Sequence, residues 1–407
     1  LEVFKGIKDE FFDCLLKMKF TGNLWAVPEG TILFPNEPIL RIEAPIIEAQ
    51  ILETYILSII NFQTLIATKA SRITNVSNGK PVIEFGSRRA HGPQAGLLAA
   101  RAAYIGGCAG TSNTLAGMRF DIPVFGTMAH SFIMSFENEL DAFRQFHNVF
   151  PSSFLLVDTY DTLNAIRMII RERIYLKGIR LDSGDLLYLS KEARKLLDET
   201  GDSNYLKVKI MASSDLNEYI IYDLVKNNAP IDIFAVGTEL CTSRDDPAFN
   251  GVYKMVAVEL QKQMVLPQNK KNNVNNQGDS SQYFYSKNGQ KIIFYKIKTS
   301  PGKKAYPGPK QIHRILDKSL NLSYDIVTLE GEVVDKSIPL LKKIIENGYS
   351  IYSLPSLKEI QEYYKNQLQI ISDFIDIYKV PESFPVRYSQ KLDKIYDELF
   401  KEYNNQT

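Results

Sequence analysis

The chain has almost no net charge, few cysteines and no long uninterrupted apolar run. Its 48 basic and 47 acidic residues leave a formal net charge of +1. So balanced a charge would steer neither nucleic acid nor a membrane surface, and we expect neither partner, although a local basic pocket remains compatible with it. The three cysteines, Cys14, Cys108 and Cys241, form no CxxC pair. They argue against structural zinc and favour a reducing compartment, the cytoplasm.

The missing apolar run also bears on the protein class. A helix that crosses a bilayer needs roughly 18 consecutive apolar residues, and the sequence offers none, which predicts a soluble protein. At 407 residues the chain is too long for one ordinary core and predicts two domains. It starts at Leu1, just before a segment, residues 7–19, that places apolar side chains on one helical face.

The middle of the chain alternates short β-branched runs with helix-length segments. About seven such units fill residues 81–237. Alternation of this kind predicts a parallel sheet, and seven successive units favour a closed barrel over an open sheet. We therefore predict an α/β fold with an irregular βα barrel of about seven parallel strands over residues 79–248.

The flanking segments follow a different pattern. Short strand-like runs separated by turns occupy residues 24–44, and the pattern over 46–73 predicts a long helix buried between the domains. Strand-like runs resume after residue 249, and residues 261–283 read as a mobile insertion. Residues 1–78 and 249–407 are thus predicted to form a smaller β-rich domain. Helices are predicted at its C-terminal end, over residues 339–347, 357–378 and 386–403.

One imidazole is the central candidate for chemistry. His130 lies in the stretch 126–131, after an apolar strand-like run and before the predicted helix 135–146. A lone histidine is often structural, but βα barrels collect their reacting groups at the C-terminal ends of strands. The strand ends here are rich in hydroxyl, small, acidic and arginine residues: Phe85, Arg88, Ser112, Thr127, Asp158, Arg180, Asp182, Ser183, Ser214, Asp215, Gly237 and Thr238.

This mixture suits a phosphorylated sugar. Arginine binds phosphate as a fork, backbone N–H groups at helix starts face phosphate oxygens, and Asp accepts from ribose hydroxyls or holds Mg²⁺. Each residue type also has a structural role. Asp or Ser before a helix is commonly an N-cap, Phe85 can fill the core, Arg88 can form surface ion pairs, and Gly237–Thr238 can be a tight turn. Repetition over seven strand ends favours a site.

Six ordered motifs resemble those of the nicotinate phosphoribosyltransferase family. They are EFGSRRAHGP (84–93), AAYIGG (102–107), GTSN (110–113), GTMAHS (126–131), RLDSGD (180–185) and GT (237–238). The likeness covers residues 20–259 closely and 307–314 more weakly. It implies an α/β barrel beside a β-rich sandwich.

The resemblance also implies an activity, the first step of NAD salvage from nicotinate. Nicotinate and phosphoribosyl pyrophosphate give nicotinate mononucleotide and pyrophosphate, and ATP is hydrolysed through a phosphohistidine. It further implies Mg²⁺ with ATP and phosphoribosyl pyrophosphate, a cytoplasmic enzyme classed as a ligase, and a homodimer with active sites near its interface.

The resemblance gives the candidate residues their expected roles. His130 would be phosphorylated by ATP, and Asp158 is the expected carboxylate that orients its other ring nitrogen. Phe85 would stack on the pyridine ring in a pocket also lined by Thr127. The phosphate, carboxylate and ribose groups would be bound by the remaining candidates: Arg88 and Arg180 (nicotinate carboxylate or diphosphate), Asp182 and Asp215 (ribose hydroxyls), Ser183 and Ser214 (substrate), and Gly237, Thr238 and Arg244 (5′-phosphate).

Two alternatives stay open. One is an enzyme of the same fold that uses nicotinamide or quinolinate; the nicotinamide-using relatives place an Asp near Ser112, so Ser112 favours the acid. The other is a catalytically silent homologue that binds phosphoribosyl ligands. Family members usually carry several dozen residues before the position of Leu1, including a tyrosine that stacks on the ring across a dimer interface. We expect this chain to lack that segment.

Overall fold

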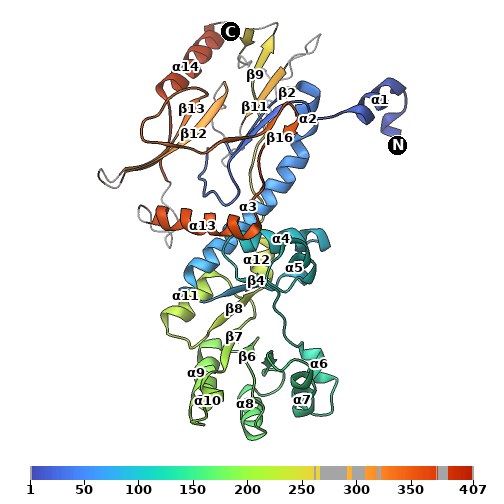
Figure 1. Ribbon diagram of the computed structural model, residues 1–407, viewed down its shortest axis with the longest axis vertical. Helices are drawn as coiled ribbons and strands as arrows, with labels where there is room; N and C mark the ends of the chain where they lie inside the picture. The colour runs from blue at the N-terminus through green and yellow to red at the C-terminus, as the bar shows by residue number, and fades with distance from the viewer. Residues whose placement is uncertain are drawn as a thin grey trace.

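The computed structural model describes residues 2–260, 263–265, 291–295, 308–317, 319, 322–372, 374 and 384–405. Two bodies are stacked along its long axis and joined by a helical connection, α2 (Ile46–Ile51) and α3 (Glu53–Val76). The lower body in Figure 1 contains the parallel strands, and the upper body contains antiparallel sheets.

Six short parallel strands form the centre of the lower body. They are β3 (Val82–Glu84), β4 (Gly110–Thr111), β5 (Phe154–Leu156), β6 (Gly178–Leu181), β7 (Lys209–Ala212) and β8 (Ile233–Val236). Their order is β4-β3-β8-β7-β6-β5. All these pairs are parallel, as the alternation in the sequence predicted.

A seventh segment brings the two edges of this sheet together. Val124 forms a parallel bridge with Thr111 of β4. Three residues later, the Thr127 hydroxyl donates a hydrogen bond of 2.8 Å to the carbonyl of Phe154 on β5. The closed ring therefore has the order β3, β4, the 124–127 segment, β5, β6, β7 and β8, and β8 pairs with β3. This confirms an α/β fold with an irregular barrel.

Helices surround the barrel, and their buried faces supply most of the core. The helices between β3 and residue 242 are η2 (Ser87–Arg89), α4 (Pro93–Ile105), α5 (Thr114–Phe120), α6 (His130–Met134), α7 (Glu139–Val149), α8 (Thr162–Arg171), α9 (Leu186–Asp198), α10 (Ser203–Leu206), α11 (Glu218–Lys226) and α12 (Thr238–Thr242). Asp161 and Asp185 cap α8 and α9 through their side chains. Among the strand-end aspartates, these two are therefore N-caps. Asp215 is not, because Asn217 caps α11.

The upper body contains two antiparallel-rich sheets. The larger comprises β1 (Asn23–Ala26), β2 (Leu40–Pro45), β9 (Met255–Leu260), β10 (Gln263–Val265), β11 (Lys291–Tyr295), β15 (Lys342–Glu346) and β16 (Tyr349–Ser350). The smaller comprises β12 (Lys310–Asp317), β13 (Leu322–Leu329), β14 (Ile338–Pro339) and β17 (Val386–Tyr388). Ile312 of β12 packs in one cluster with Trp25 of β1, which joins the two sheets.

The antiparallel body corrects several local predictions. The helix predicted over 339–347 is strand β15, which pairs with β1. The last predicted helix is shorter, because 386–388 form β17 before α14 (Gln390–Asn405) begins. Apart from β10, the predicted insertion 261–283 lies outside the described residues. The domain limits at residues 78 and 248 remain a prediction.

One C-terminal helix returns to the barrel. α13 (Leu357–Ser372) packs against α4, and its end reaches α4 in Figure 1. Its Gln361 side chain donates hydrogen bonds to the carbonyls of Tyr104 (2.5 Å) and Cys108 (2.9 Å). Both carbonyls lie just before β4. The C-terminal part of the chain therefore supplies hydrogen-bond donors to the end of α4 and to the start of β4.

The long helix is less buried than the sequence suggested. In α3 the buried residues are Ile66, Lys69, Ala70 and Ile73, all in the half next to the barrel, whereas Tyr55 is 69% exposed. By length and composition alone, the helical segment 46–76 is apolar enough to cross a membrane. The sequence analysis had expected no such helix, because it found no uninterrupted apolar run. Core helices of soluble proteins pass the same test.

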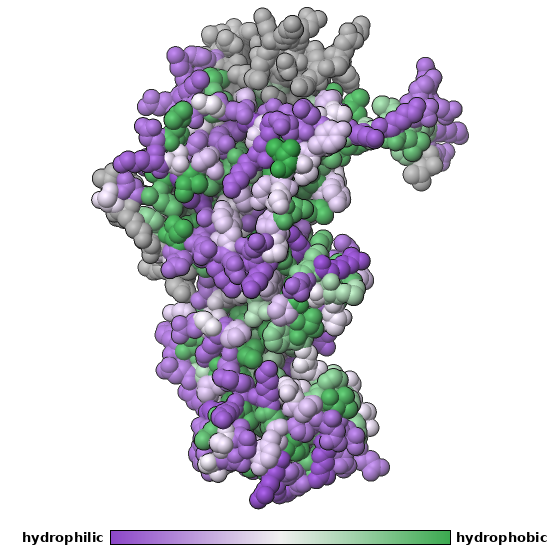
Figure 2. Space-filling view, in the orientation of Figure 1, coloured by the Kyte–Doolittle hydropathy of each residue, from purple (hydrophilic) through white to green (hydrophobic). Residues whose placement is uncertain are grey.

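The N-terminal segment forms an arm that projects from the upper body (Figure 1). It contains η1 (Glu2–Phe4) and α1 (Asp9–Lys17). The predicted amphipathic helix is present, but none of its residues is buried, and Leu16 is 85% exposed. Figure 2 shows hydrophobic residues exposed on this arm.

Candidate active site

His130 is the first residue of α6, directly after the segment that closes the barrel. Its Nδ1 lies 3.1 Å from the Thr159 hydroxyl, and its Nε2 lies 3.3 Å from Asp182 Oδ2. The side chain is 35% exposed. Two neighbouring strand ends thus fix the orientation of an imidazole that solvent or a ligand can still reach.

Asp182 lies at the centre of this cluster. Arg180 Nη2 is 2.7 Å from Asp182 Oδ1, and the Ser213 hydroxyl donates to the same oxygen. Burial pushes the pKa of Asp182 upward. The Arg180 guanidinium and the hydrogen bonds from Ser213, Arg180 and His130 outweigh burial and hold this pKa below its ordinary value. Asp182 is therefore a carboxylate at neutral pH.

The predicted pairing of Asp158 with His130 is wrong. Asp158 Oδ2 instead accepts hydrogen bonds from the Asp182 backbone N–H (2.8 Å) and the Ser183 hydroxyl (2.6 Å). Asp158 turns toward the loop after β6 because that loop presents two donors to it. Its link to the His130 cluster is the hydrogen bond from the Asp182 N–H. Its other oxygen, Oδ1, is buried without a hydrogen-bond partner.

These contacts define the tautomer of His130. An ionised Asp182 can only accept, so the proton of a neutral imidazole belongs on Nε2. The lone pair is then on Nδ1, where the Thr159 hydroxyl can donate to it. This leaves a nucleophilic nitrogen beside a hydroxyl, and a carboxylate opposite that stabilises positive charge on the ring.

A second cluster lies beneath Phe85. Glu84 is buried; its side chain accepts a hydrogen bond of 2.5 Å from the Thr111 hydroxyl and another from the Gly86 N–H. A Cβ on Gly86 would lie 2.5 Å from the Cβ of Cys241 on α12. Only glycine allows this approach, which brings Gly237 and Thr238, at the start of α12, beside Phe85. Burial raises the pKa of Cys241 to about 11, with Glu84 adding to the effect, so this thiol is a packing group.

Other predicted residues also reach the site. The centre of the Arg180 guanidinium lies 5.9 Å from the centroid of the Phe85 ring. Ser112 donates its N–H to the Glu84 carbonyl between two strand ends. Ser183 and Asp215 are exposed at the ends of β6 and β7, as is Ser214, whose φ is +103°.

Three predicted residues are placed differently from their expected roles. The Thr127 hydroxyl is used in closing the barrel. Arg88 is exposed on η2. Arg244 is 66% exposed and pairs with Glu239 at 3.2 Å, and within the described residues no hydrogen bond or ion pair joins it to the His130 cluster.

The sequence interpretation missed three contributors. Thr159 and Ser213 contact the His130–Asp182 pair directly, and both occupy strand ends that it had described as rich in hydroxyls. Glu139 is 8% exposed at the start of α7. Burial raises its pKa to about 7, and repulsion from Asp161 and Asp158 adds to the effect. No sequence signal marked Glu139, because its proximity to β5 depends on how α7 packs.

Three family models match the chain. They are the nicotinate phosphoribosyltransferase N-terminal domain (residues 1–61), the nicotinate phosphoribosyltransferase family (81–294) and the nicotinate phosphoribosyltransferase C-terminal domain (335–396). The first match overturns the expectation that the family's N-terminal segment is missing, because residues 1–61 correspond to that domain.

The chain is also similar to individual proteins. The nicotinate phosphoribosyltransferase of Bacillus subtilis is 38% identical over 427 residues, covering 96% of this chain and 81% of that protein. A crystal structure of human nicotinic acid phosphoribosyltransferase matches with a TM-score of 0.74 at 22% identity, covering 98% of this chain and 86% of that one. A nicotinate-nucleotide pyrophosphorylase structure from Pyrococcus furiosus has a TM-score of 0.66 at 26% identity, covering 89% and 84%.

Proposed function

The chain belongs to the nicotinate phosphoribosyltransferase family, and from this premise we propose that it makes nicotinate mononucleotide and pyrophosphate from nicotinate and phosphoribosyl pyrophosphate. We further propose that it couples this reaction to ATP hydrolysis through a phosphorylated His130, as a cytoplasmic ATP-dependent ligase. The observation that carries the coupling is the placement of His130 between Thr159 and an ionised Asp182.

The phosphoryl transfer follows from the tautomer. As the Thr159 hydroxyl gives up its hydrogen bond to Nδ1, the freed lone pair attacks the γ-phosphorus of ATP, an N–P bond forms, and the bond from that phosphorus to the β–γ bridging oxygen breaks to release ADP. The Nε2–H remains directed at Asp182, which balances the positive charge on the ring. Water later attacks the same phosphorus, releasing inorganic phosphate and returning the neutral imidazole.

The glycosyl transfer uses the neighbouring strand ends. The pyridine nitrogen of nicotinate bonds to C1 of the ribose as the bond to the pyrophosphate oxygen breaks. In our assignment Phe85 stacks on the ring, and Arg180 and Arg88 bind the nicotinate carboxylate or the diphosphate. The sugar and its phosphate are assigned to residues at the ends of β6, β7 and β8: Asp182, Ser183, Ser214, Asp215, Gly237 and Thr238.

The proposed reaction implies Mg²⁺, which would arrive with the phosphates of both substrates. Among the described residues no group of three or more metal-ligating side chains is present. Mg²⁺ in phosphate-handling sites uses only one or two carboxylates together with the phosphates. The buried, unpartnered Oδ1 of Asp158 fits such a ligand, and bound Mg²⁺ would neutralise phosphate charge there.

We also propose a homodimer with active sites near the interface. The support is apolar surface that a single chain leaves open. The arm carrying α1 has no buried residue, and Ile47, Ile51 and Tyr55 on the connecting helices are 58%, 53% and 69% exposed. Patches of this kind mark association surfaces. Light scattering should give twice the mass of one chain.

Incubation with γ-labelled ATP tests the phosphohistidine. The protein should acquire an acid-labile phosphoryl group that is lost in His130→Ala and retained in His147→Gln. The absence of label from the unaltered protein would contradict the coupling and favour the catalytically silent alternative. Substrate competition between nicotinate, nicotinamide and quinolinate then tests the choice of nicotinate as substrate. Turnover of nicotinamide or of quinolinate, but not of nicotinate, would overturn that choice.

A further inference from the structure

Glu84, the last residue of β3, is a buried acid that takes no part in the proposed reaction. Its side chain is 1% exposed, and among the residues that the structure describes no ion pair includes it. Burying a carboxyl group without a cation is unfavourable unless hydrogen bonds compensate for the lost water. Burial accordingly raises the pKa of Glu84, and the hydrogen bonds from Thr111 and Gly86 act in the opposite direction. The places of these two donors indicate what the acid does.

The first donor fixes the turn that follows β3. The Gly86 N–H donates to Glu84 Oε1, and the Cys241 thiol donates to the Gly86 carbonyl at 3.2 Å. Phe85, between these two residues, donates its own N–H to the Val236 carbonyl of β8 at 2.8 Å. The backbone on both sides of Phe85 is therefore held, and with it the direction in which the ring leaves the strand.

The second donor fixes the turn that follows β4. The Thr111 hydroxyl donates to Glu84 Oε2 at 2.5 Å, and its oxygen accepts the Asn113 N–H at 3.0 Å. Ser112, between them, donates its N–H to the Glu84 carbonyl at 2.9 Å. This turn is thus attached to Glu84 through both the side chain and the backbone of the acid.

We propose that Glu84 is a positioning residue for nicotinate, because its carboxyl group holds the turns that carry Phe85 and Ser112 at a fixed separation. The inference rests on the proposed function, in which Phe85 stacks on the pyridine ring. Ser112 is the position near which nicotinamide-using relatives are expected to carry an Asp, so its placement bears on the choice of the acid. Glu84 itself does not touch the substrate. Groups that bind a ligand are oriented by the hydrogen bonds around them, and loosening these bonds weakens binding.

The chemistry of the carboxyl group separates hydrogen bonding from packing. Glu84 presents one oxygen to a backbone N–H and the other to a hydroxyl. Glutamine at this position can accept from the N–H and donate to the Thr111 oxygen, so it keeps both contacts. Methionine fills a similar volume and provides neither. A positioning role therefore predicts that Glu84→Gln retains the binding of nicotinate and that Glu84→Met does not.

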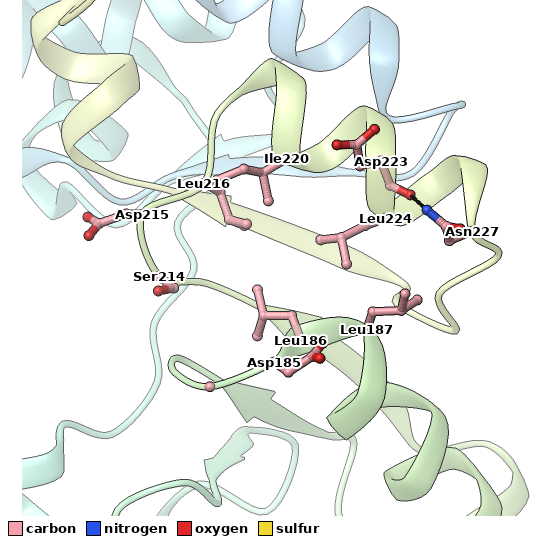
Figure 3. A pocket seen from close by; sticks show the side chains of 11 residues that line it. Asp185, Leu186, Leu187, Ser214, Asp215, Leu216, Ile220, Asp223, Leu224 and Asn227 are labelled. Atoms are coloured by element: carbon pink, nitrogen blue, oxygen red, sulfur yellow. Dashed lines mark hydrogen bonds between the residues drawn. The ribbon is translucent and has the colours of Figure 1, made fainter.

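The sugar phosphate is assigned largely to other strand ends. Ser214 and Asp215 follow β7 and are seen at the edge of the cavity in Figure 3, and β8 separates β7 from β3. His130 contacts Thr159 and Asp182, which follow β5 and β6. Loss of the Glu84 hydrogen bonds should therefore weaken the binding of nicotinate more than that of phosphoribosyl pyrophosphate, and should spare the phosphorylation of His130.

Steady-state kinetics with each substrate varied in turn test this proposal. Glu84→Met should raise the KM for nicotinate about tenfold or more, the equivalent of at least one hydrogen bond. The KM for phosphoribosyl pyrophosphate and the labelling of His130 by ATP should change by no more than about threefold. Glu84→Gln should restore most of the KM for nicotinate. Thr111→Val removes one donor and should raise this KM less than Glu84→Met, and Thr111→Ser should restore it.

The matched control is Thr328→Val, the same substitution at an equally buried position of the other body, which should leave both KM values unchanged. No turnover of nicotinate by the unaltered protein contradicts the proposed function. Normal turnover with an unchanged KM for nicotinate in Glu84→Met overturns the positioning role alone. An equal rise in both KM values also overturns it, because a general disturbance of the barrel has that effect. If circular dichroism shows that Glu84→Met does not fold, Thr111→Val and Thr111→Ser decide by the same comparison.

Discussion

The barrel and the sandwich each contain a close Arg–Asp pair, and the surroundings of the two pairs are opposite. In the barrel Arg180 meets Asp182 at 2.7 Å, and the side chains are 14% and 18% exposed. In the sandwich Arg314 meets Asp325 at 2.6 Å, and the side chains are 2% and 0% exposed. The same kind of ion pair is thus accessible to ligands in the barrel and buried away from solvent in the sandwich.

The sandwich pair is enclosed by protein groups. Arg314 donates to Asp325 through Nε and Nη2 and to the Ile32 carbonyl. Its guanidinium lies 5.5 Å from the Phe34 ring centroid. Burial, together with Asp325, raises the pKa of Glu37 well above its ordinary value, which disfavours a second negative charge beside the pair. Every charge here is balanced inside the protein, as a structural site requires.

The barrel pair is completed differently. Asp182 holds Arg180 on one oxygen and faces His130 with the other, and the imidazole is 35% exposed. An ion pair therefore indicates chemistry when a titratable group lies against it and can be reached from solvent. Burial alone indicates a structural role.

The largest expected effect comes from removing the charge of the barrel pair. Asp182→Asn keeps the shape but loses the carboxylate that stabilises the charged ring of His130. We expect single-turnover labelling of His130 to slow about 10³-fold. Asp161→Asn is the matched control, because asparagine caps a helix as well as aspartate does. Labelling at an unchanged rate in Asp182→Asn would refute its role.

The sandwich pair should respond in stability. Arg314→Met leaves Asp325 buried without its cation and should lower the free energy of unfolding by about 3–5 kcal/mol. Urea denaturation measures this loss, while labelling of His130 per folded molecule should not change. The same substitution at exposed Arg387 is the control. A large loss of labelling in folded Arg314→Met would break the comparison.

The buried acid Glu139, near the site, should make the stability of the protein depend on pH. The pKa of Glu139 is raised to about 7 from an ordinary 4.5, so folding is penalised when Glu139 is charged in both states. The penalty grows between these two values, is fully present above pH 7, and is absent below pH 4.5. Glu139→Gln should therefore raise the free energy of unfolding by about 1–3 kcal/mol at pH 8. An equal gain at pH 4.5 would show another cause.

The smallest effect is expected at Thr159. Thr159→Val removes the hydroxyl that orients the Nδ1 side of His130 while keeping the shape. Labelling should slow about tenfold, the equivalent of one hydrogen bond. Thr159→Ser restores the hydroxyl and should recover most of the rate. If serine gives no recovery, packing of the methyl group rather than the hydrogen bond is responsible.

The sequence predicted the barrel because its signal is local. Each strand and helix between residues 81 and 237 carries its own apolar pattern, and strand ends of a parallel barrel meet whatever the details of packing. His130, Arg180 and Asp182 were found in this way. The sandwich is held by antiparallel pairs far apart in sequence, such as β1 with β15. Residues 342–346 therefore read as helix until their partner was known.

Side-chain partners were harder to predict than positions. Asp158 and Asp182 are both strand-end acids, and nothing in the sequence says which one faces His130. That choice depends on the loop after β6, whose N–H and hydroxyl groups draw Asp158 away. The exposure of α3 was missed because apolar composition does not tell whether the covering surface belongs to the same chain.

The contact of Gln361 with the barrel bears on how this protein can be divided. Its amide satisfies two carbonyls that precede β4, and β4 pairs with the strand that carries Glu84. Excising or exchanging the barrel at residue 248 would therefore remove the donor of these two carbonyls. A minimal fragment or chimaera would have to keep α13, because the last quarter of the chain completes the end of α4.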